Sequence, residues 1–114
     1  MKIISWNVRG LGNTRTFLAL REILQEHRPQ IVLVCETRMK PGQMTDKSKM
    51  LGFDNCFTVS RNGMRGGLAL LWSSDVNVTI APYSNHHIDA IVQGAEGMKW
   101  RCTGVYGHPE NNKK

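Results

Sequence analysis

The chain has 114 residues, of which 40% are hydrophobic and 21% charged, and its net charge is +6. This length fits one small domain, and the positive charge favours a polyanionic partner over an acidic small molecule. The longest apolar runs, such as "GLALLW", are too short to cross a bilayer, and the N-terminus lacks a signal-peptide pattern. We interpret Cys35, Cys56 and Cys102 as reduced, buried thiols of an intracellular protein, either nuclear or cytoplasmic.

The N-terminal third of the sequence predicts a strand, a helix and a second strand. "KIISWNV" is β-branched, and "IVLVCE" is almost wholly apolar, which indicates a strand buried on both faces. Between them, "TFLALREILQEH" has the spacing of an amphipathic helix, with Asn13 or Thr14 as its N-cap and Pro29 as its stop. The order predicts a βαβ unit with two parallel strands in one sheet.

The rest of the chain predicts a short helix followed by β structure. A polar helical stretch covers about residues 43–51 and ends at Gly52. "FDNCFTVS" and "LALLWSS" flank the turn "RNGMRGG" and form a first hairpin, whereas "HIDAIVQ" and "KWRCTGVYG" form another. "VNVTIAPY" alternates like a strand, and "HPENNKK" (108–114) is expected to be a flexible tail. The sequence contains no internal repeat or linker, so all elements belong to one unit.

Two polar residues stand where the parallel strands end, Asn7 after the first and Glu36 after the second. Ligands in such sheets gather beyond the carboxyl ends of the strands, so the two side chains are expected to converge. A carboxylate at that edge can hold Mg²⁺, which accepts one or two carboxylates and keeps several waters. Asn7 can donate to a phosphate oxygen or hold a neighbouring carboxylate in position.

Each of these residues also has a plain structural reading. Glu36 could cap the following segment or pair with Arg38, and Asn7 could close its strand through an Asx turn. Arg61 and Arg65 on the hairpin tip suit contacts with a phosphate backbone, but they could equally keep the tip soluble. Tyr106 could bond a phosphate or simply lie at the sheet rim.

Other catalytic patterns are excluded by their missing parts. His86 and His87 are adjacent and would face opposite sides of a strand, and H-x-E at residues 108–110 lacks a P-C-x-x-C partner, so zinc is rejected. The sequence has no G-x-S-x-G setting, no G-x-G-x-x-G and no P-loop.

Taken in order, the segments resemble a known superfamily. "ISWNVRGLG", "IVLVCETRM", "RGGLALLW", "HHIDAIV" and "WRCTGVYGHPE" together resemble the endonuclease/exonuclease/phosphatase superfamily, with its deoxyribonuclease I-like fold. Within that group they look most like the endonuclease domain of plant non-LTR (LINE-type) retrotransposons. The resemblance implies an α/β (α+β) fold, namely the first half of a four-layer α/β-sandwich with a mixed sheet, an N-terminal βαβ unit and then antiparallel hairpins.

The resemblance also implies roles for particular residues. Glu36 would be the metal ligand, Asn7 would position the phosphate and the acidic cluster, and Tyr106 would contact the scissile phosphate. The cofactor would be Mg²⁺ or Mn²⁺ and the partner DNA. Arg9 stands where related enzymes often carry Asp, which removes an acidic contact and offers a cation to nucleic acid, as do Arg61 and Arg65.

The resemblance covers only part of the family's pattern. Residues 1–114 would be the N-terminal part of a single domain, truncated before the family's G-D-x-N and S-D-H blocks, which supply the general base. We therefore expect weak metal binding, no catalysis by this fragment alone, and no membrane partner. An exposed apolar face would favour the missing half-domain or self-association. The alternatives are a non-catalytic basic nucleic-acid-binding remnant, or a fragment of a small-substrate phosphatase of the same superfamily.

Overall fold

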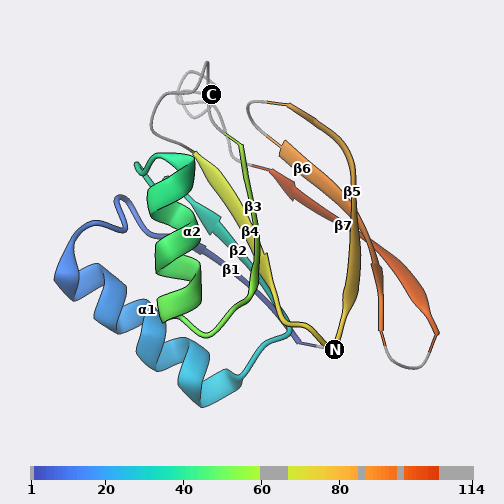
Figure 1. Cartoon of the computed structure of the whole chain (residues 1–114), viewed down its shortest axis with the longest axis horizontal. Helices are drawn as coiled ribbons and strands as arrows, with labels where there is room; N and C mark the ends of the chain where they lie inside the picture. Colours follow the sequence, from blue (N-terminus) through green and yellow to red (C-terminus); the bar gives the residue numbers. More distant parts are fainter. Residues whose placement is uncertain (1, 60–66, 85–86, 95–96, 106–114) are drawn as a thin grey trace, which may run out of the picture.

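The computed structural model describes residues 2–59, 67–84, 87–94 and 97–105. The N-terminal third is a βαβ unit of β1 (Ile3–Asn7), α1 (Thr14–His27) and β2 (Ile31–Cys35) (Figure 1). β1 and β2 pair in parallel, with the last residues of the two strands opposite each other. The predicted unit is confirmed, and its two strands end at one edge of the sheet.

Local hydrogen bonds explain where α1 begins and ends. The side-chain oxygen of Asn13 accepts from the backbone N–H groups of Arg15 and Thr16, at 2.9 and 3.2 Å, so Asn13 is the N-cap. The helix closes at Arg28, whose φ is 46° and whose N–H donates to the carbonyl of Leu24 at 2.8 Å. This left-handed residue stands directly before proline, which cannot continue a helix.

The second helix, α2 (Pro41–Met50), begins two residues before the predicted start at 43. Proline suits the first helical position because its fixed φ is already helical and its missing N–H is not needed there. The backbone N–H of Lys40 donates to Oε1 of Gln43 at 3.1 Å, which closes the start of the helix. None of the helices in the described ranges is both long and apolar enough to cross a membrane.

In the described part of the chain, seven strands form two sheets. β3 (Asn55–Val59) and β4 (Leu68–Trp72) are antiparallel, as predicted for this hairpin, but β4 lies between β2 and β3, which gives the order β1-β2-β4-β3. The second sheet has the order β5-β6-β7 and is antiparallel throughout, with β5 (Asn77–Ser84), β6 (His87–Gln93) and β7 (Lys99–Val105). The predicted α/β class with a mixed sheet is confirmed.

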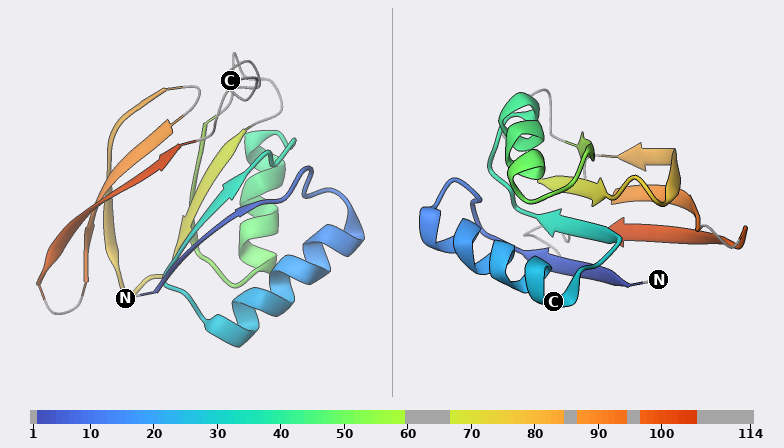
Figure 2. Two further views of the ribbon diagram at one scale, coloured as in Figure 1. Left: turned by 180° about the vertical axis from the view of Figure 1, so that it is seen from behind. Right: turned by 60° about the horizontal axis from the view of Figure 1, so that its bottom comes forward.

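The described residues pack as three layers. Figures 1 and 2 show α1 and α2 on one side of the four-stranded sheet and the three-stranded sheet on its other side. Buried β2 serves both interfaces, because Val32 and Val34 pack under the helices while Ile31, Leu33 and Cys35 face the second sheet. This alternation explains the almost continuous apolar run of the strand.

The far face of the second sheet carries an ion pair between a buried carboxylate, that of Asp89, and the exposed side chain of Arg101. Asp89 is only 5% exposed and lies opposite the apolar face that its neighbours Ile88 and Ala90 present to the core. Its two carboxylate oxygens accept from Nε of Arg101 at 3.0 and 2.9 Å, and Thr103 Oγ1 adds a bond of 3.1 Å. These bonds satisfy a buried charge and tie β6 to β7.

Candidate functional site

The backbone fixes the segments that follow β1 and β2 against each other. The N–H of Gly10 donates to the carbonyl of Glu36 at 2.7 Å, and the N–H of Leu11 donates to that of Thr37 at 3.0 Å. The N–H of Glu36 itself donates to the carbonyl of Gly67, beside β4, at 2.5 Å. Glu36 is therefore held from both sides at the carboxyl edge of the sheet.

The predicted convergence of Asn7 and Glu36 is confirmed. The side-chain amide Nδ2 of Asn7 donates to Oε2 of Glu36 over 2.6 Å, although the residues are 29 positions apart. A hydrogen bond to an ionised acceptor is short and stronger than a neutral one. It restrains the carboxylate, whose side chain is 23% exposed, beside the end of β1.

Asn7 also makes the Asx turn that is the purely structural alternative for this residue. Its Oδ1 accepts from the backbone N–H of Arg9 at 3.1 Å, which is an Asx turn. Because one end of the amide closes the turn and the other end donates to Glu36, the two readings of Asn7 are compatible. The turn fixes the amide in the orientation that presents its NH₂ group to the carboxylate.

Three non-glycine residues at this edge have left-handed backbone conformations. Arg9, Glu36 and Arg38 have φ values of 50°, 56° and 55°. Such conformations are uncommon for residues other than glycine and cost about 1–3 kcal/mol each. Two of the three surround Thr37, which is only 2% exposed. Strain that is concentrated in this way is typical of functional sites, where the surrounding structure holds it in place.

Arg38 is the second partner of Glu36. Its terminal nitrogen NH2 lies 3.5 Å from Oε1 of Glu36, so the ion pair between Glu36 and Arg38 that the sequence suggested is also present. The Arg38 side chain is 63% exposed, and exposed pairs of this kind contribute little stability. The carboxylate thus has one firmly bonded oxygen and one oxygen facing a loosely held guanidinium.

The donor chemistry of this edge fits a magnesium-type cation in part. Glu36 offers a carboxylate oxygen, and Mg²⁺ is commonly held by one or two carboxylates together with waters and substrate phosphates. Within the described ranges, no group of three or more His, Cys, Asp or Glu residues could hold a metal ion. The described part of this edge therefore supplies one protein ligand for such a cation, the carboxylate of Glu36, and Asn7 would keep that carboxylate oriented.

Three of the predicted site residues fall outside the described ranges. Tyr106, Arg61 and Arg65 are in that group, so their roles stay predictions. Arg9 is described and exposed at the same edge as Asn7. Sequence reasoning treated Arg38 only as a possible partner of Glu36 and gave Gly10 no role. The E-T-R triplet was the available signal, because it puts a cationic side chain only two residues after the carboxylate of Glu36.

The thiols are not part of a reactive site. Cys35 is buried, but Cys56 and Cys102 are only half-buried, so the prediction of three buried thiols is wrong for these two. They lie on β3 and β7, which are outer strands of their sheets and are covered less completely than β2. Burial raises the pKa of all three thiols, to about 11 for Cys56, which keeps them protonated and unreactive.

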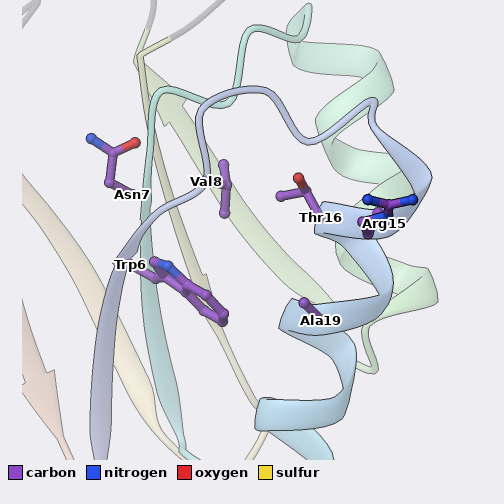
Figure 3. A pocket seen from close by; sticks show the side chains of 6 residues that line it. All are labelled: Trp6, Asn7, Val8, Arg15, Thr16 and Ala19. Carbon is purple, nitrogen blue, oxygen red and sulfur yellow. The ribbon is translucent and has the colours of Figure 1, made fainter.

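A pocket of about 260 Å³ lies on the other side of β1, between that strand and α1. Figure 3 shows the indole of Trp6 directed toward α1, while the side chain of Asn7 points away on the opposite side of the strand. The pocket is therefore separate from the carboxylate of Glu36. It is lined by Trp6, Asn7, Val8, Arg15, Thr16 and Ala19.

Several solved structures share this fold. The AP endonuclease LMAP of Leishmania major has a TM-score of 0.61 and 14% identity, covering 98% of this chain and 43% of its own. Humanised TDP2 of D. rerio has a TM-score of 0.62 and 19% identity, covering 99% and 50%. A 3′ phosphatase from Neisseria, bound to a product DNA hairpin, has a TM-score of 0.60 and 17% identity, covering 99% and 46%.

At these identities the likeness shows the fold, and the chain spans about half the length of each of these structures. A search of curated protein sequences finds no match. The sequence pattern of the endonuclease/exonuclease/phosphatase family, in contrast, matches residues 4–111, which is nearly the whole chain. The chain therefore belongs to the endonuclease/exonuclease/phosphatase family.

Proposed function

We propose that this chain is the N-terminal part of a metal-dependent DNA phosphodiesterase domain that derives from a retrotransposon endonuclease. The observation that carries the proposal is the hydrogen bond between Asn7 and Glu36 at the carboxyl ends of two parallel strands. Family membership and the DNA hairpin bound by one structural neighbour support DNA as the partner. The net charge of +6 also suits a polyanion.

The proposed roles follow from the chemistry of each side chain. Glu36 would hold Mg²⁺ or Mn²⁺, which when bound supplies Lewis-acid stabilisation of charge on a phosphoryl oxygen. Asn7 orients the carboxylate of Glu36, and its fixed position limits the ways in which that group can turn. Tyr106 would donate to the phosphate, while Arg9, Arg61 and Arg65 would contact the nucleic-acid backbone.

We further propose that residues 1–114 do not catalyse hydrolysis by themselves. A single carboxylate binds Mg²⁺ weakly, and the sequence contains neither of the family's G-D-x-N and S-D-H blocks, which would supply the general base. A polypeptide carrying those blocks is the partner that would complete the site. In the described residues, Ile3 on β1 and Trp100 on β7 are 46% and 39% exposed, so apolar surface is available for that half-domain or for self-association.

A plasmid-nicking assay with Mg²⁺ tests this proposal, first on the chain alone and then with a C-terminal half from a family member added. We expect no nicking by the chain alone and nicking in the mixture that Glu36→Ala abolishes. Nicking by the isolated chain that depends on Glu36 would refute the inactivity, and nicking unaffected by Glu36→Ala would refute the assigned site. Descent from a longer nuclease domain is tested by the coding sequence after codon 114, where remnants of the two blocks are expected.

A second candidate function is nucleic-acid binding without catalysis. It is favoured by the positions of Arg9 and Arg38, two arginines within the same short stretch of sheet edge. Binding through such contacts would weaken steeply as the salt concentration rises, because it depends on the release of counterions from the phosphates.

A further inference from the structure

We propose that the guanidinium of Arg38 is a built-in counter-cation of Glu36. A divalent cation must displace this guanidinium before the cation can use both sides of the carboxylate. The inference rests on the proposed function, because it concerns regulation of the same site. Oε2 of Glu36 is bonded to Asn7 at 2.6 Å, whereas Oε1 lies 3.5 Å from the guanidinium of Arg38. Both oxygens are thus occupied, one by a firm donor and one by a displaceable cation.

The backbone places Arg38 next to this carboxylate. Glu36 and Arg38 both have left-handed φ values, 56° and 55°, with one buried residue between them. The Arg38 side chain crosses Gly10, where an added Cβ would lie 3.4 Å from its Cδ and 3.8 Å from its NH1. Those distances are ordinary van der Waals contacts, so it is the φ of 100° at Gly10, and not a shortage of space, that favours glycine where the Arg38 side chain passes.

The pair is held loosely enough to exchange. A distance of 3.5 Å is longer than a good charge-assisted hydrogen bond, and the Arg38 side chain is 63% exposed. Water can solvate the guanidinium as it leaves, so the loss of this contact costs little. Asn7 remains bonded to Oε2 meanwhile, so the carboxylate keeps its orientation when Arg38 moves.

Displacement of Arg38 has two consequences. A guanidinium beside Glu36 neutralises the carboxylate in the absence of a divalent cation and so weakens the attraction that such a cation experiences. Arginine keeps its charge at every physiological pH, so the released side chain becomes available to a phosphate diester at the same edge. Cation binding and phosphate binding are then linked through one side chain.

Manganese binding tests the first consequence without any measurement of activity. The full chain is titrated with Mn²⁺ at constant ionic strength, and the free ion is followed by electron paramagnetic resonance. Arg38→Met is expected to bind Mn²⁺ roughly three- to tenfold more tightly than the parent, because a repelling charge is removed. Arg38→Lys should remain near the parent, and so should Arg21→Met, which removes an exposed charge from α1.

Unchanged or weaker Mn²⁺ binding by Arg38→Met overturns the inference. If neither the parent nor Arg38→Met binds Mn²⁺, both this inference and the metal site of the proposed function are overturned.

The parent protein allows a second measurement that needs no substitution at residue 38. The NMR signal of the Arg38 Nε–H group should shift as Mg²⁺ is added, and in Glu36→Gln it should start close to the shifted position and stay there.

A signal of Arg38 that does not respond to Mg²⁺, while the chain binds the ion, overturns the inference and leaves the proposed function intact. Failure of the reconstituted plasmid assay, with the Arg38 signal and the Mn²⁺ affinities behaving as expected, would instead refute the phosphodiesterase proposal alone. The two ideas therefore fail on different measurements.

Discussion

The side-chain amide of Asn7 joins two neighbouring segments at once: its nitrogen donates to Glu36 at 2.6 Å and its oxygen accepts from the N–H of Arg9 at 3.1 Å. The turn and the carboxylate are consequently fixed by one planar group. If either bond is lost, the amide can rotate and the other bond weakens with it. Substitutions of Asn7 should therefore separate the structural role of this residue from its electrostatic role.

Asn7→Asp is predicted to make the stability of the protein depend on divalent cations. The substituted residue keeps an oxygen for the turn but places a second negative charge beside Glu36. Without a cation, repulsion between the two carboxylates should lower the free energy of unfolding by about 1 kcal/mol. Mg²⁺ should recover this loss, because two carboxylates bind it better than one. Thermal unfolding with and without Mg²⁺ measures the difference.

Asn77→Asp is the matched control, since Asn77 is an exposed residue of β5 and gains the same charge away from the site. Its midpoint of unfolding should respond to Mg²⁺ no more than that of the parent. If Asn7→Asp gains no more from Mg²⁺ than this control, the edge formed by Asn7 and Glu36 is not a cation site. Asn7→Ala, which removes both bonds, should be destabilised whether Mg²⁺ is present or not.

The βαβ unit that carries the site should depend strongly on the packing of α1. Leu20 is fully buried beneath the helix, whereas Leu18 on the same helix is 46% exposed. Leu20→Ala should lower the free energy of unfolding by about 3 kcal/mol, because it removes apolar contacts and leaves a cavity. Leu18→Ala should change it by less than about 0.5 kcal/mol. Urea unfolding of the two variants compares them, and equal losses would contradict this account of the core.

The sequence was sufficient to predict features that depend on local periodicity. The apolar spacing of α1 and the unbroken run of β2 predicted the βαβ unit, and the unit itself dictates that Asn7 and Glu36 meet. The position of β4 between β2 and β3 was not predictable in this way, because it depends on long-range pairing that has no local signature.

The finer geometry of the site could not be predicted from the sequence either. Glu36 and Arg38 both have left-handed conformations, and the backbone of Glu36 is bonded to two segments far away in the chain, through its N–H to Gly67 and through its carbonyl to Gly10. Neither residue type prefers that conformation, so propensity favours a different backbone at these positions. Tertiary contacts decide the outcome, and they also bring the guanidinium of Arg38 to Glu36.

Arg9→Asn should separate backbone strain from charge at the edge of the site. Arg9 has a φ of 50°, a conformation that Asn adopts more readily than Arg. The variant should therefore unfold at an equal or slightly higher urea concentration than the parent. Its affinity for DNA should fall, and the slope of log affinity against log salt should decrease in magnitude by about 1 if Arg9 contacts a phosphate.

Arg21→Gln serves as the control for the charge itself, because Arg21 is exposed in the middle of α1. It lowers the net charge by the same amount but should leave the salt slope close to that of the parent. Equal effects of the two substitutions on DNA binding would mean that only the overall charge matters. The contact assigned to Arg9 would then be wrong.

The thiol of Cys56 should make the protein less stable in alkaline solution. Burial raises its pKa from 9.0 to about 11, and a side-chain hydrogen bond with Ser48 only partly opposes this effect. In the unfolded chain the thiol ionises at a lower pH than in the folded protein. Its stabilising contribution is therefore complete below pH 9.0 and is lost as the pH rises toward 11.

Other groups titrate in this range, so the relevant quantity is the difference in free energy of unfolding between the parent and Cys56→Ala. Between about pH 8 and about pH 11, the free energy of unfolding of Cys56→Ala should rise relative to that of the parent, because the variant has no thiol to ionise. Parallel losses of stability in the two proteins would show that Cys56 is not desolvated in solution.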